Sequence, residues 1–458
     1  MLADVVPRDL IEDVLAETGK REQRKRLLPA HVVVRFCQAM CLFFDDDYEE
    51  VVRKLVGSLQ DMRSWSGSWH VPTASAISQA RTALGPKPMR ELFDRVAVPV
   101  AGLGTKGAWL RSRRLMAVDG FVLDVPDTDS NVAAFDYSQS GERRSAYPQV
   151  RVVGLGECGS HAIVDAVFDG CRIGEQTLLP QLFRSLDSDM LLLADRNFYS
   201  YDLWCQAVNT GAALLWRVSA SVSLPVVVEL FDGSYLSVVF RKALRGYHRD
   251  AIIESVKNGE KVHPAQATVV RVVEYTIPDR VGDGKRETIR LITTVLDPSD
   301  TPAIELAAAY HERWEFEGVI DEIKTHQRGL ARVLRSKTAD LVRQEIWSLL
   351  LTHYAIRALM CRAADEADTD PDRLSFMRSL RVIRRQVTGQ ADFSPDTRRK
   401  ALAETISEIL QRPNRARRNR TEPRALKRLT HNGYPGRKAR HPGIVHQKPP
   451  TIQLRQTA

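Results

Sequence analysis

Apolar residues recur every three to four positions in the first sixty residues, which is the spacing of one buried face of a helix. The pattern covers residues 9–17, 29–43 and 48–59, and the aspartates at 45–47 are placed to cap the third segment. Residues 1–65 are therefore predicted to form an all-α N-terminal domain.

Residues 66–110 carry signals for two further short helices. Thr73 is a predicted N-cap for a helix that Gly85 ends, and Pro88 opens a second helix that reaches about Ala97. Two helices across a glycine turn suggest a helix-turn-helix-like DNA-binding unit. The side chains facing DNA would be Ser75, Ser78, Gln79 and Arg81. The alternative, that these helices only pack within an all-α domain, stays open.

After residue 111 the period of the pattern becomes that of β-strands. Strands are predicted at 115–117, 121–125, 150–156, 161–168, 190–194 and 212–218, with helices at 177–186 and 202–208. Paired strands, followed by strands that alternate with helices, predict a mixed α/β fold in which helices cover a mixed sheet. This domain spans 111–218 and resumes at 299–364, where the pattern is helical again.

The two parts of this domain are separated by a β-rich insertion at 219–298. Strands are predicted at 224–230, 235–242, 268–276 and 287–296, with turns at 232–233 and 282–285. The basic loop 257–263 is a candidate DNA contact within the insertion. Residues 365–410 are expected to form a C-terminal helical region.

The net charge of +9 is concentrated at the C-terminus. Residues 411–458 hold 13 Lys and Arg against one acid, Glu422, so the first 410 residues have a net charge of 9 − 12 = −3. The cations lie among Pro, Asn and Gly, which bury too little apolar surface to order the chain. This tail is expected to be a disordered arm that binds polyanions, with a merely solubilising tail as the alternative.

Cysteine usage and the N-terminus bear on the compartment. The six cysteines show no zinc-binding spacing, and they are interpreted as reduced thiols of a cytoplasmic protein. Residues 1–10 lack a basic region followed by an apolar core, and Arg35 and Gln38 interrupt the longest apolar stretch. Neither secretion nor membrane insertion is expected.

Four chemically distinctive side chains share one face of a predicted helix. At about 100° per residue, Tyr310, Arg313, Glu317 and Lys324 fall within about 60° of one another. An apolar flank formed by Phe316, Val319, Ile320 and Ile323 places this row at the edge of a buried surface. The alternative is an ordinary solvated face, because Arg313 and Glu317 form a common i,i+4 pair.

Two aspartates stand at the ends of apolar strands. Asp119 follows residues 115–118, and Asp195 follows the apolar run 190–194. Acids delivered by strands, together with a helical Glu, suit Mg²⁺, which prefers oxygen ligands. Asp119 could instead serve a turn, and Asp195 could cap a helix or form a salt bridge.

The Tyr-x2-Arg-x3-Glu-x6-Lys spacing resembles the signature of insertion-sequence-4 family transposases, which belong to the DDE group. Val118-Asp119-Gly120 and the Leu-Ala-Asp-Arg-Asn-Phe run at 193–198 are similar to the first two acidic motifs, and residues 5–59 resemble the family's N-terminal domain. The resemblance covers most of residues 5–330. It implies a ribonuclease H-like mixed sheet, interrupted by a β-rich insertion and preceded by an all-α domain.

The resemblance also implies the chemistry. Asp119 would bridge two Mg²⁺ ions about 3.5 to 4 Å apart, with Asp195 and Glu317 each completing one site, and Mn²⁺ could substitute. Double-stranded DNA would be contacted by Arg196, Arg313, Lys324, Tyr310 and Trp314, with the cations on phosphates. None of the three acids is expected to shuttle protons.

The activity implied is cut-and-paste transposition by a bacterial protein that associates with the nucleoid when bound to DNA. Hydrolysis at each element end would free a 3′-OH that attacks the other strand or the target DNA, and two paired ends imply a homodimer on DNA. If a DNA hairpin is used, the stacking aromatic would be Tyr235, Phe240, Tyr247, Tyr275 or Trp216. The alternatives are a two-metal nuclease without strand transfer and an inactive DNA-binding relative.

Overall fold

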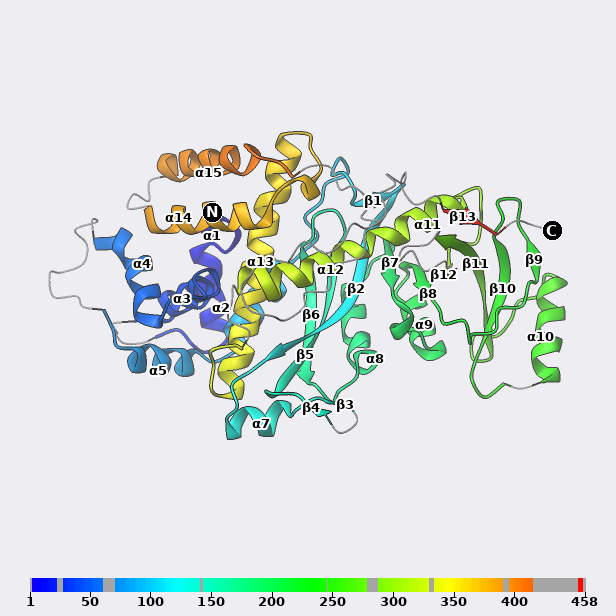
Figure 1. Cartoon of the computed structure of the whole chain (residues 1–458), viewed down its shortest axis with the longest axis horizontal. Coiled ribbons are helices and arrows are strands. Elements are labelled where there is room, and N and C mark those ends of the chain that lie inside the picture. Colours follow the sequence, from blue (N-terminus) through cyan, green and yellow to red (C-terminus); the bar gives the residue numbers. More distant parts are fainter. Residues whose placement is uncertain are drawn as a thin grey trace, which may run out of the picture. The chain divides into compact units, whose positions relative to one another are not determined.

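The computed structural model of the chain describes residues 2–22, 28–60, 71–140, 143–244, 246–277, 287–328, 333–389, 395–414 and 452–455 (Figure 1). The predicted turn at 282–285 and most of the basic tail lie outside these residues. The chain divides into two compact units, Met1–Leu214 with His311–Asn414, and Leu215–Tyr310 with Arg415–Ala458. The predicted seven-part division of the chain is finer than this and stays a prediction.

The first unit begins with helices, as the sequence pattern predicts. They are α1 (Leu2–Val5), α2 (Arg8–Glu17), α3 (Ala30–Leu42), α4 (Tyr48–Gln60), α5 (Ala74–Leu84) and α6 (Lys87–Val96). The side chain of Thr73 caps α5 by accepting a hydrogen bond from Ala76 N, and Gly85 ends the helix with a φ of 71°. The capping signals of this sequence therefore set the ends of α5.

Arg81 corrects the DNA-facing set predicted for α5. Its side chain is buried (1% exposed), and its guanidinium donates to Gln344, Tyr48 and Ser336 at 2.9, 2.6 and 2.9 Å. A buried guanidinium needs such partners, because its charge cannot be solvated there. Arg81 therefore holds α5 against other segments of the unit, whereas Ser75 and Gln79 are exposed.

A mixed sheet forms the centre of the first unit, with strands in the order β6-β5-β2-β7. Its elements are β1 (Trp109–Leu110), β2 (Arg113–Asp124), β5 (Gln149–Glu157), β6 (Ile163–Gly170) and β7 (Met190–Ala194). β5 is antiparallel to both β2 and β6, while β7 runs parallel to β2. The two strands predicted at 115–117 and 121–125 are thus one long strand.

Short elements connect these strands. They are α7 (Asp129–Phe135), the strand pair β3 (Gln139–Ser140) and β4 (Arg143–Arg144), α8 (Glu175–Leu178), a 3-10 helix (Leu179–Ser185), a 3-10 turn (Arg196–Phe198) and α9 (Tyr201–Val208). The helix predicted at 177–186 is therefore mostly 3-10, and Pro180 stands at its start.

The rest of the first unit is helical. It comprises α12 (Trp314–Asp321), a π-helix (Glu322–Gln327), α13 (Ala339–Glu366), a 3-10 turn (Pro371–Arg373), α14 (Phe376–Gly389) and α15 (Pro395–Leu410). α13 is central, since it packs against α3, α6, α14 and α15. It buries polar side chains as well as apolar ones, including Gln344, Glu345, His353 and Arg357.

The single regular helix predicted around residues 310–324 is wrong. Tyr310 ends a separate helix, α11 (Ala303–Glu312), Arg313 lies between it and α12, and Lys324 lies in the π-helix. A π-helical turn contains more residues than an α-helical turn, so the angular register changes after Asp321. Tyr310 and Arg313 are buried, whereas Glu317 and Lys324 are exposed.

The second unit is a β-rich insertion, as predicted. Its strands are β8 (Ala213–Arg217, of which Leu215 onward belongs to this unit), β9 (Val228–Glu229), β10 (Tyr235–Phe240), β11 (Ala267–Ile277) and β12 (Glu287–Thr293). They pair antiparallel in the order β8-β12-β11-β10-β9. A helix that the sequence pattern did not predict, α10 (Tyr247–Lys257), has no fully buried residue and therefore leaves only a weak periodic signal.

The end of the tail differs from the predicted disorder. A short strand, β13 (Gln453–Leu454), pairs with Tyr275 and Thr276 of β11. Arg455 adds a backbone hydrogen bond to Glu274 O at 3.1 Å, and its guanidinium lies over the ring of Tyr235. Backbone pairing with a strand edge does not depend on an apolar sequence, which is why composition did not predict it.

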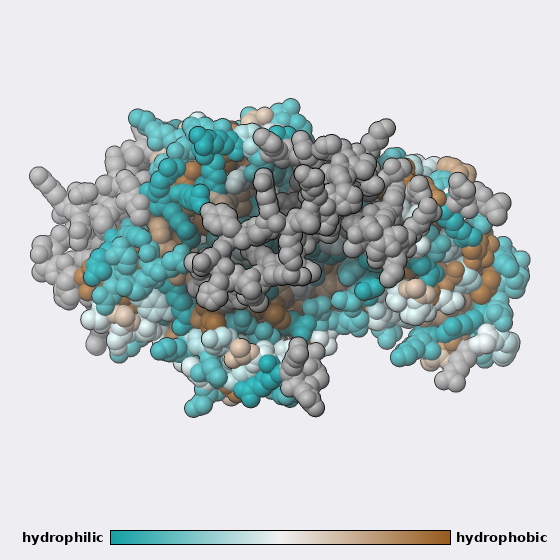
Figure 2. All heavy atoms as spheres, in the orientation of Figure 1, coloured by the Kyte–Doolittle hydropathy of each residue, from teal (hydrophilic) through white to brown (hydrophobic). Residues whose placement is uncertain are grey.

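No helix within the described residues is long and apolar enough to cross a membrane. The cysteines are free thiols, five buried and Cys205 half-buried, as the sequence predicts. On the face shown in Figure 2, the described surface is mostly hydrophilic and its apolar residues form small separate groups.

Candidate active site

Parallel pairing of β2 with β7 brings Asp119 and Asp195 to equivalent positions. The last paired residues are Val118 and Ala194, and each acid follows directly. Asp195 stands at the N-terminus of a 3-10 turn but makes no capping hydrogen bond, which removes one alternative role for it. Two neighbouring strand positions thus carry carboxylates, as adjacent positions of parallel strands should.

Helix α12 crosses the sheet and carries Glu317 (Figure 1). Phe316 packs on β5 at Gly156, where an added Cβ would lie 2.4 Å from its ring. A glycine is needed there because the helix comes so close to the strand. This contact fixes α12 on the face that bears Asp119, whose partner in β5 is Gly154.

Arg313 lies between the first acid and the helical acid. Its Nη1 is 3.3 Å from Asp119 Oδ2, and its Nη2 is 3.8 Å from Glu317 Oε1. The Arg313 side chain is only 5% exposed, compared with 22% for Asp119 and 46% for Glu317. One buried guanidinium therefore brings together two acids that lie almost 200 positions apart in the chain.

The environment raises the pKa of Asp119. Burial is the main cause, and the negative charges of Glu175 and Asp195 add to it, against the lowering effects of the Gly120 N–H and Arg313. Among these groups, negative charge exceeds the positive charge that Arg313 supplies. Such a site favours a further cation.

Asp195 supplies an independent sign that the site suits a metal ion. Its Oδ1 atom is buried and has no hydrogen-bond partner within the described residues. A buried carboxylate oxygen without a partner is costly, and ligation of a hard cation would remove that cost. With Asp119 and Glu317, it gives the set of oxygen donors that Mg²⁺ and Mn²⁺ accept.

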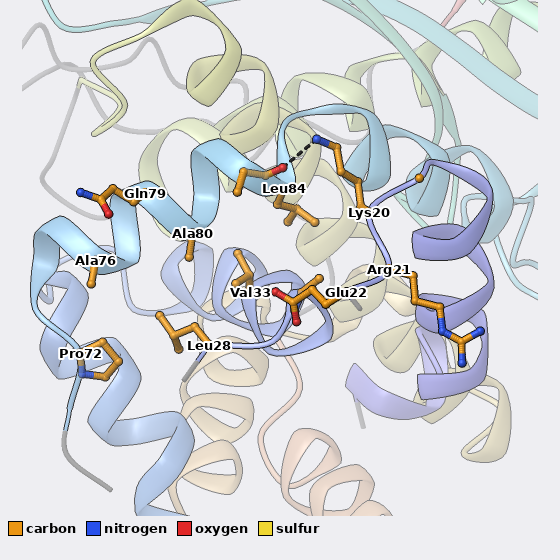
Figure 3. A pocket seen from close by; sticks show the side chains of 13 residues that line it. Lys20, Arg21, Glu22, Leu28, Val33, Pro72, Ala76, Gln79, Ala80 and Leu84 are labelled. Atoms are coloured by element: carbon orange, nitrogen blue, oxygen red, sulfur yellow. Dashed lines mark hydrogen bonds between the residues drawn. The ribbon is translucent and has the colours of Figure 1, made fainter. Parts of the chain in front are cut away.

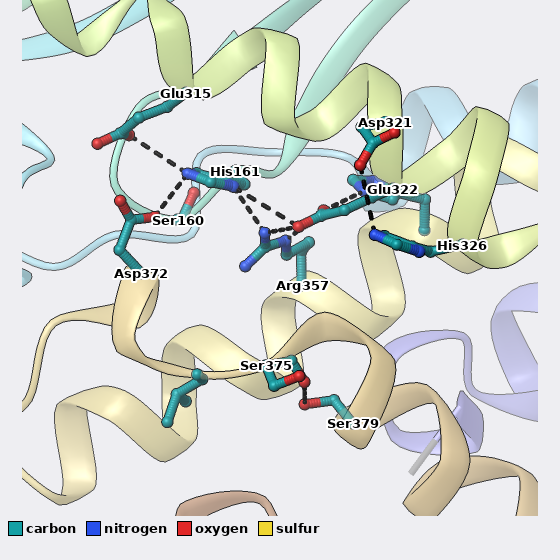
Figure 4. Close-up of polar contacts among 12 residues, drawn as sticks. Ser160, His161, Glu315, Asp321, Glu322, His326, Arg357, Asp372, Ser375 and Ser379 are labelled. Atoms are coloured by element: carbon teal, nitrogen blue, oxygen red, sulfur yellow. Dashed lines mark hydrogen bonds and ion pairs between the residues drawn. The ribbon is translucent and has the colours of Figure 1, made fainter. Parts of the chain in front are cut away.

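A second group of acids lies behind α12. His161, Glu315 and Asp372 are the one trio in the described chain whose possible metal-ligand atoms lie within 4.8 Å of one another. His161 Nε2 is 2.8 Å from Asp372 Oδ1 and 3.4 Å from Glu315 Oε2 (Figure 4). Asp119, Asp195 and Glu317 do not meet that distance limit and are therefore more widely spread.

Arg357 distinguishes this trio from an ordinary metal site. Its Nη2 is 2.6 Å from His161 Nδ1, so that nitrogen accepts a hydrogen bond and the ring proton lies on Nε2, which faces the acids. A metal-binding Nε2 needs its lone pair, and its Nδ1–H usually donates to an acceptor. Arg357 also pairs with Glu322, to which His353 Nε2 is 3.1 Å away. The geometry is that of a buried ion-pair network.

The residues predicted to contact DNA differ in exposure. Arg196 and Lys324 are exposed, and Trp314 is 39% exposed with Arg313 over its ring at 5.2 Å. Tyr310 is buried (2% exposed), so its predicted contact with DNA does not fit this structure. Arg313 is likewise buried and lies against the acids, not at the surface.

The sequence pattern missed Glu175 and Arg151. Arg151 Nη1 lies 3.0 Å from Glu175 Oε1, and the carboxyl group of Glu175 lies against Gly120. No periodicity marks either residue, because their proximity to Asp119 comes from sheet topology. A glycine directly after a strand-borne acid was the only available hint.

A cavity of about 720 Å³ lies elsewhere, between α5, the start of α3 and the segment that follows α2 (Figure 3). Its lining includes Lys20, Glu22, Leu28, Val33 and Gln79, but none of the acids described above. The largest hollow therefore does not mark the acid-bearing site.

A ribonuclease H-like mixed sheet that presents two strand-borne acids, with a third acid on a helix across its face, defines the class of DDE transposases. The family described as "Transposase DDE domain" matches residues 110–354. The family described as "Insertion element 4 transposase N-terminal" matches residues 1–94. The chain belongs to the insertion-sequence-4 family of DDE transposases, whose catalytic domain uses divalent metal ions.

Relatives agree with this assignment. The chain is 28% identical to "Transposase InsG for insertion sequence element IS4" of Escherichia coli (strain K12) over 429 residues, 93% of this chain and 91% of that protein. It is 27% identical to "Putative transposase InsZ" of the same strain over 222 residues, 48% of this chain and 71% of that protein. A solved piggyBac transposase synaptic complex with hairpin DNA has a TM-score of 0.43 and 12% identity, covering 91% of this chain and 85% of that chain.

Proposed function

We propose that this transposase binds the ends of its insertion sequence and catalyses DNA cleavage and strand transfer at Asp119, Asp195 and Glu317. The observation that carries the proposal is the position of Arg313 between Asp119 and Glu317, beside a strand end that carries Asp195. A stable fold does not require three acids to lie so near one another, because their charges repel. Their proximity is explained if they share a cationic ligand.

The three acids would hold two Mg²⁺ ions, with Asp119 contributing to both sites. Bound Mg²⁺ supplies activation of the attacking hydroxyl or water, stabilisation of the leaving oxygen and neutralisation of phosphate charge. Arg313 keeps Asp119 and Glu317 oriented while the site is open. The buried Oδ1 of Asp195 is already free of competing hydrogen bonds within the described residues.

DNA is the proposed partner, in the form of element ends and target. Lys324 and Arg196 are exposed cations close in sequence to Glu317 and Asp195, so both suit phosphate contacts near the cut. Trp314, partly exposed beside Arg313, suits stacking or packing against a nucleotide. Two ends held together imply a homodimer in the DNA complex.

The test is cleavage and joining of a duplex that carries the terminal sequences of the element. Wild-type protein with Mg²⁺ should release a 3′-OH and join it to a second duplex. Glu317→Gln should reduce cleavage about 100-fold or more, because a lost metal ligand removes several kcal/mol of transition-state stabilisation. Asp321→Asn is the matched control, since Asp321 is an exposed acid of the same helix.

The outcomes separate the alternative functions. Cleavage without joining would identify a two-metal nuclease. If Glu317→Gln binds the duplex as wild type does and only cleavage is lost, a pure DNA-binding role is excluded. If wild type binds but never cleaves with either Mg²⁺ or Mn²⁺, the catalytic proposal fails and an inactive DNA-binding relative remains.

A further inference from the structure

Glu175 lies against Gly120, the residue that follows Asp119 on β2. A Cβ atom added at Gly120 would lie 2.4 Å from Glu175 Oε1 and 2.5 Å from its Cδ, so a glycine here leaves room for the carboxyl group. Glu175 is the first residue of α8, which precedes β7 and Asp195 in the chain. The chain therefore delivers a fourth carboxylate to the strand that bears Asp119.

The sheet is open where these groups meet. Asp119 and Gly120 point to opposite faces of β2, since successive strand residues alternate. β2 pairs with β7 only as far as Val118 and Ala194, so β7 does not cover the edge of β2 beyond that point. Asp119 Oδ1 accepts a hydrogen bond from Gly120 N at 2.8 Å, which turns the carboxylate toward the Gly120 backbone.

The charge of Glu175 is felt at Asp119. Burial is the main cause of the raised pKa of Asp119, and the negative charge of Glu175 raises it further, by more than that of Asp195 does. Glu175 is therefore electrostatically as much a neighbour of Asp119 as the second acid of the DDE set is.

Arg151 holds Glu175 in place. Its Nη1 is 3.0 Å from Glu175 Oε1, and its Nη2 donates to Cys171 O at 3.1 Å. The two side chains are 25% and 22% exposed, so the pair is partly solvated and contributes little to stability. A weak, solvated pair is easily exchanged for another cation.

We propose that Glu175 acts as a fourth carboxylate of the metal-binding group, facing the divalent cation that Asp119 holds. The inference rests on the proposed function, because it assumes that Asp119 binds a metal ion. In the metal-free protein, Arg151 occupies the carboxylate, and Gly120 keeps the space for it beside Asp119.

The test is Mn²⁺ binding to the full-length protein without DNA, measured from the paramagnetic resonance signal of free Mn²⁺. Glu175→Gln should weaken Mn²⁺ binding about 10-fold, the scale of effect seen when a group that supports metal ligands is lost. Arg151→Met removes the competing cation, so it should leave the affinity unchanged or increase it. Equal weakening by both substitutions would show that the pair is only structural and would overturn the proposal.

Two reference variants make every result decisive. Asp119→Asn should abolish the binding; if it binds Mn²⁺ as wild type does, the proposed metal site itself is wrong. If Asp119→Asn fails to bind while Glu175→Gln binds normally, only the role of Glu175 is refuted. Gly120→Ala keeps every charge but displaces the Glu175 carboxyl group, so it should also weaken binding, and it decides the question if Glu175→Gln does not fold.

Discussion

Helix α12 and the π-helix after it carry two kinds of acid, and their surroundings differ in a way that separates chemistry from structure. The open acid group comprises Asp119, Asp195, Glu175 and Glu317. The buried acid group comprises Glu315, Glu322 and Asp372. In the open group an oxygen of Asp195 lacks a partner within the described residues. In the buried group each acid lies beside His161 or Arg357.

The difference follows from what each environment demands. Burial alone would raise the pKa of Glu322, but Arg357 and hydrogen bonds from His161 and His353 lower it well below its usual value. The open group shows the opposite outcome, since the pKa of Asp119 is raised. Compact geometry therefore does not identify a metal site here; insufficient neutralisation does.

The largest expected effect is on the buried acid group. Arg357→Met would leave Glu322 buried without its principal cation, because Arg357 donates to both carboxylate oxygens. Breaking a buried pair on one side costs about 3 to 5 kcal/mol. Denaturant unfolding should show this loss of stability in the first unit.

Arg362→Met is the matched control on the same helix. Arg362 pairs with Glu366 at an exposed position, so its loss should change the free energy of unfolding by about 0.5 kcal/mol or less. Comparable losses in the two variants would mean that Arg357 contributes no more than a surface cation does.

Acid should expose the same contrast. Because the pKa of Glu322 in the folded chain lies below its usual value of 4.5, its contribution to stability is present above pH 4.5 and is lost as the pH falls toward the folded-state pKa. Wild type should therefore lose stability in this window. Arg357→Met should start from a lower stability and lose less, which unfolding curves at several pH values would reveal.

A steep loss that is identical in the two proteins would contradict this assignment, because the contribution of Glu322 depends on Arg357. The comparison requires wild type and variant in the same buffer series. Asp119 contributes in the opposite sense, since a raised carboxylate pKa makes folding more favourable in acid.

The sequence pattern predicted what local chemistry controls. The Thr73 cap, the strand before Asp195 and the alternation of strands and helices follow from periodicity and capping, and the structure contains all three. The motif spacing also singled out Arg313 and Glu317 together, which Arg313 contacts. These features depend on residues that are near one another in the chain.

The failures involve tertiary structure. Arg81 was predicted to face DNA, but its partners Gln344 and Ser336 come from more than 250 positions away. Glu175 gained no attention because its proximity to Gly120 depends on how α8 returns to β2. The π-helix that displaces Lys324 has no periodic signature of its own.

Metal-dependent stability should distinguish the two acid groups next. At a Mn²⁺ concentration about 100 times Kd, binding to the folded state alone adds about 2.7 kcal/mol. Asp119→Asn should remove this gain, whereas Asp372→Asn should keep it, because the His161 network is assigned to structure. Thermal unfolding with and without Mn²⁺ gives the answer, and loss of the gain in Asp372→Asn alone would transfer the metal site to the buried acid group.

The smallest effect is expected from removing charge in the open acid group without metal. Asp195→Asn relieves repulsion between neighbouring carboxylates and offers an amide that donates, so metal-free stability should rise slightly or stay within about 0.5 kcal/mol of wild type. The acid that matters most for cleavage would then matter least for folding, and the chelator-treated proteins can be compared by denaturant unfolding. A loss of about 2 kcal/mol or more would mean that Asp195 makes a structural contact, such as the salt bridge considered from the sequence, and that its unpaired oxygen does not mark a metal site.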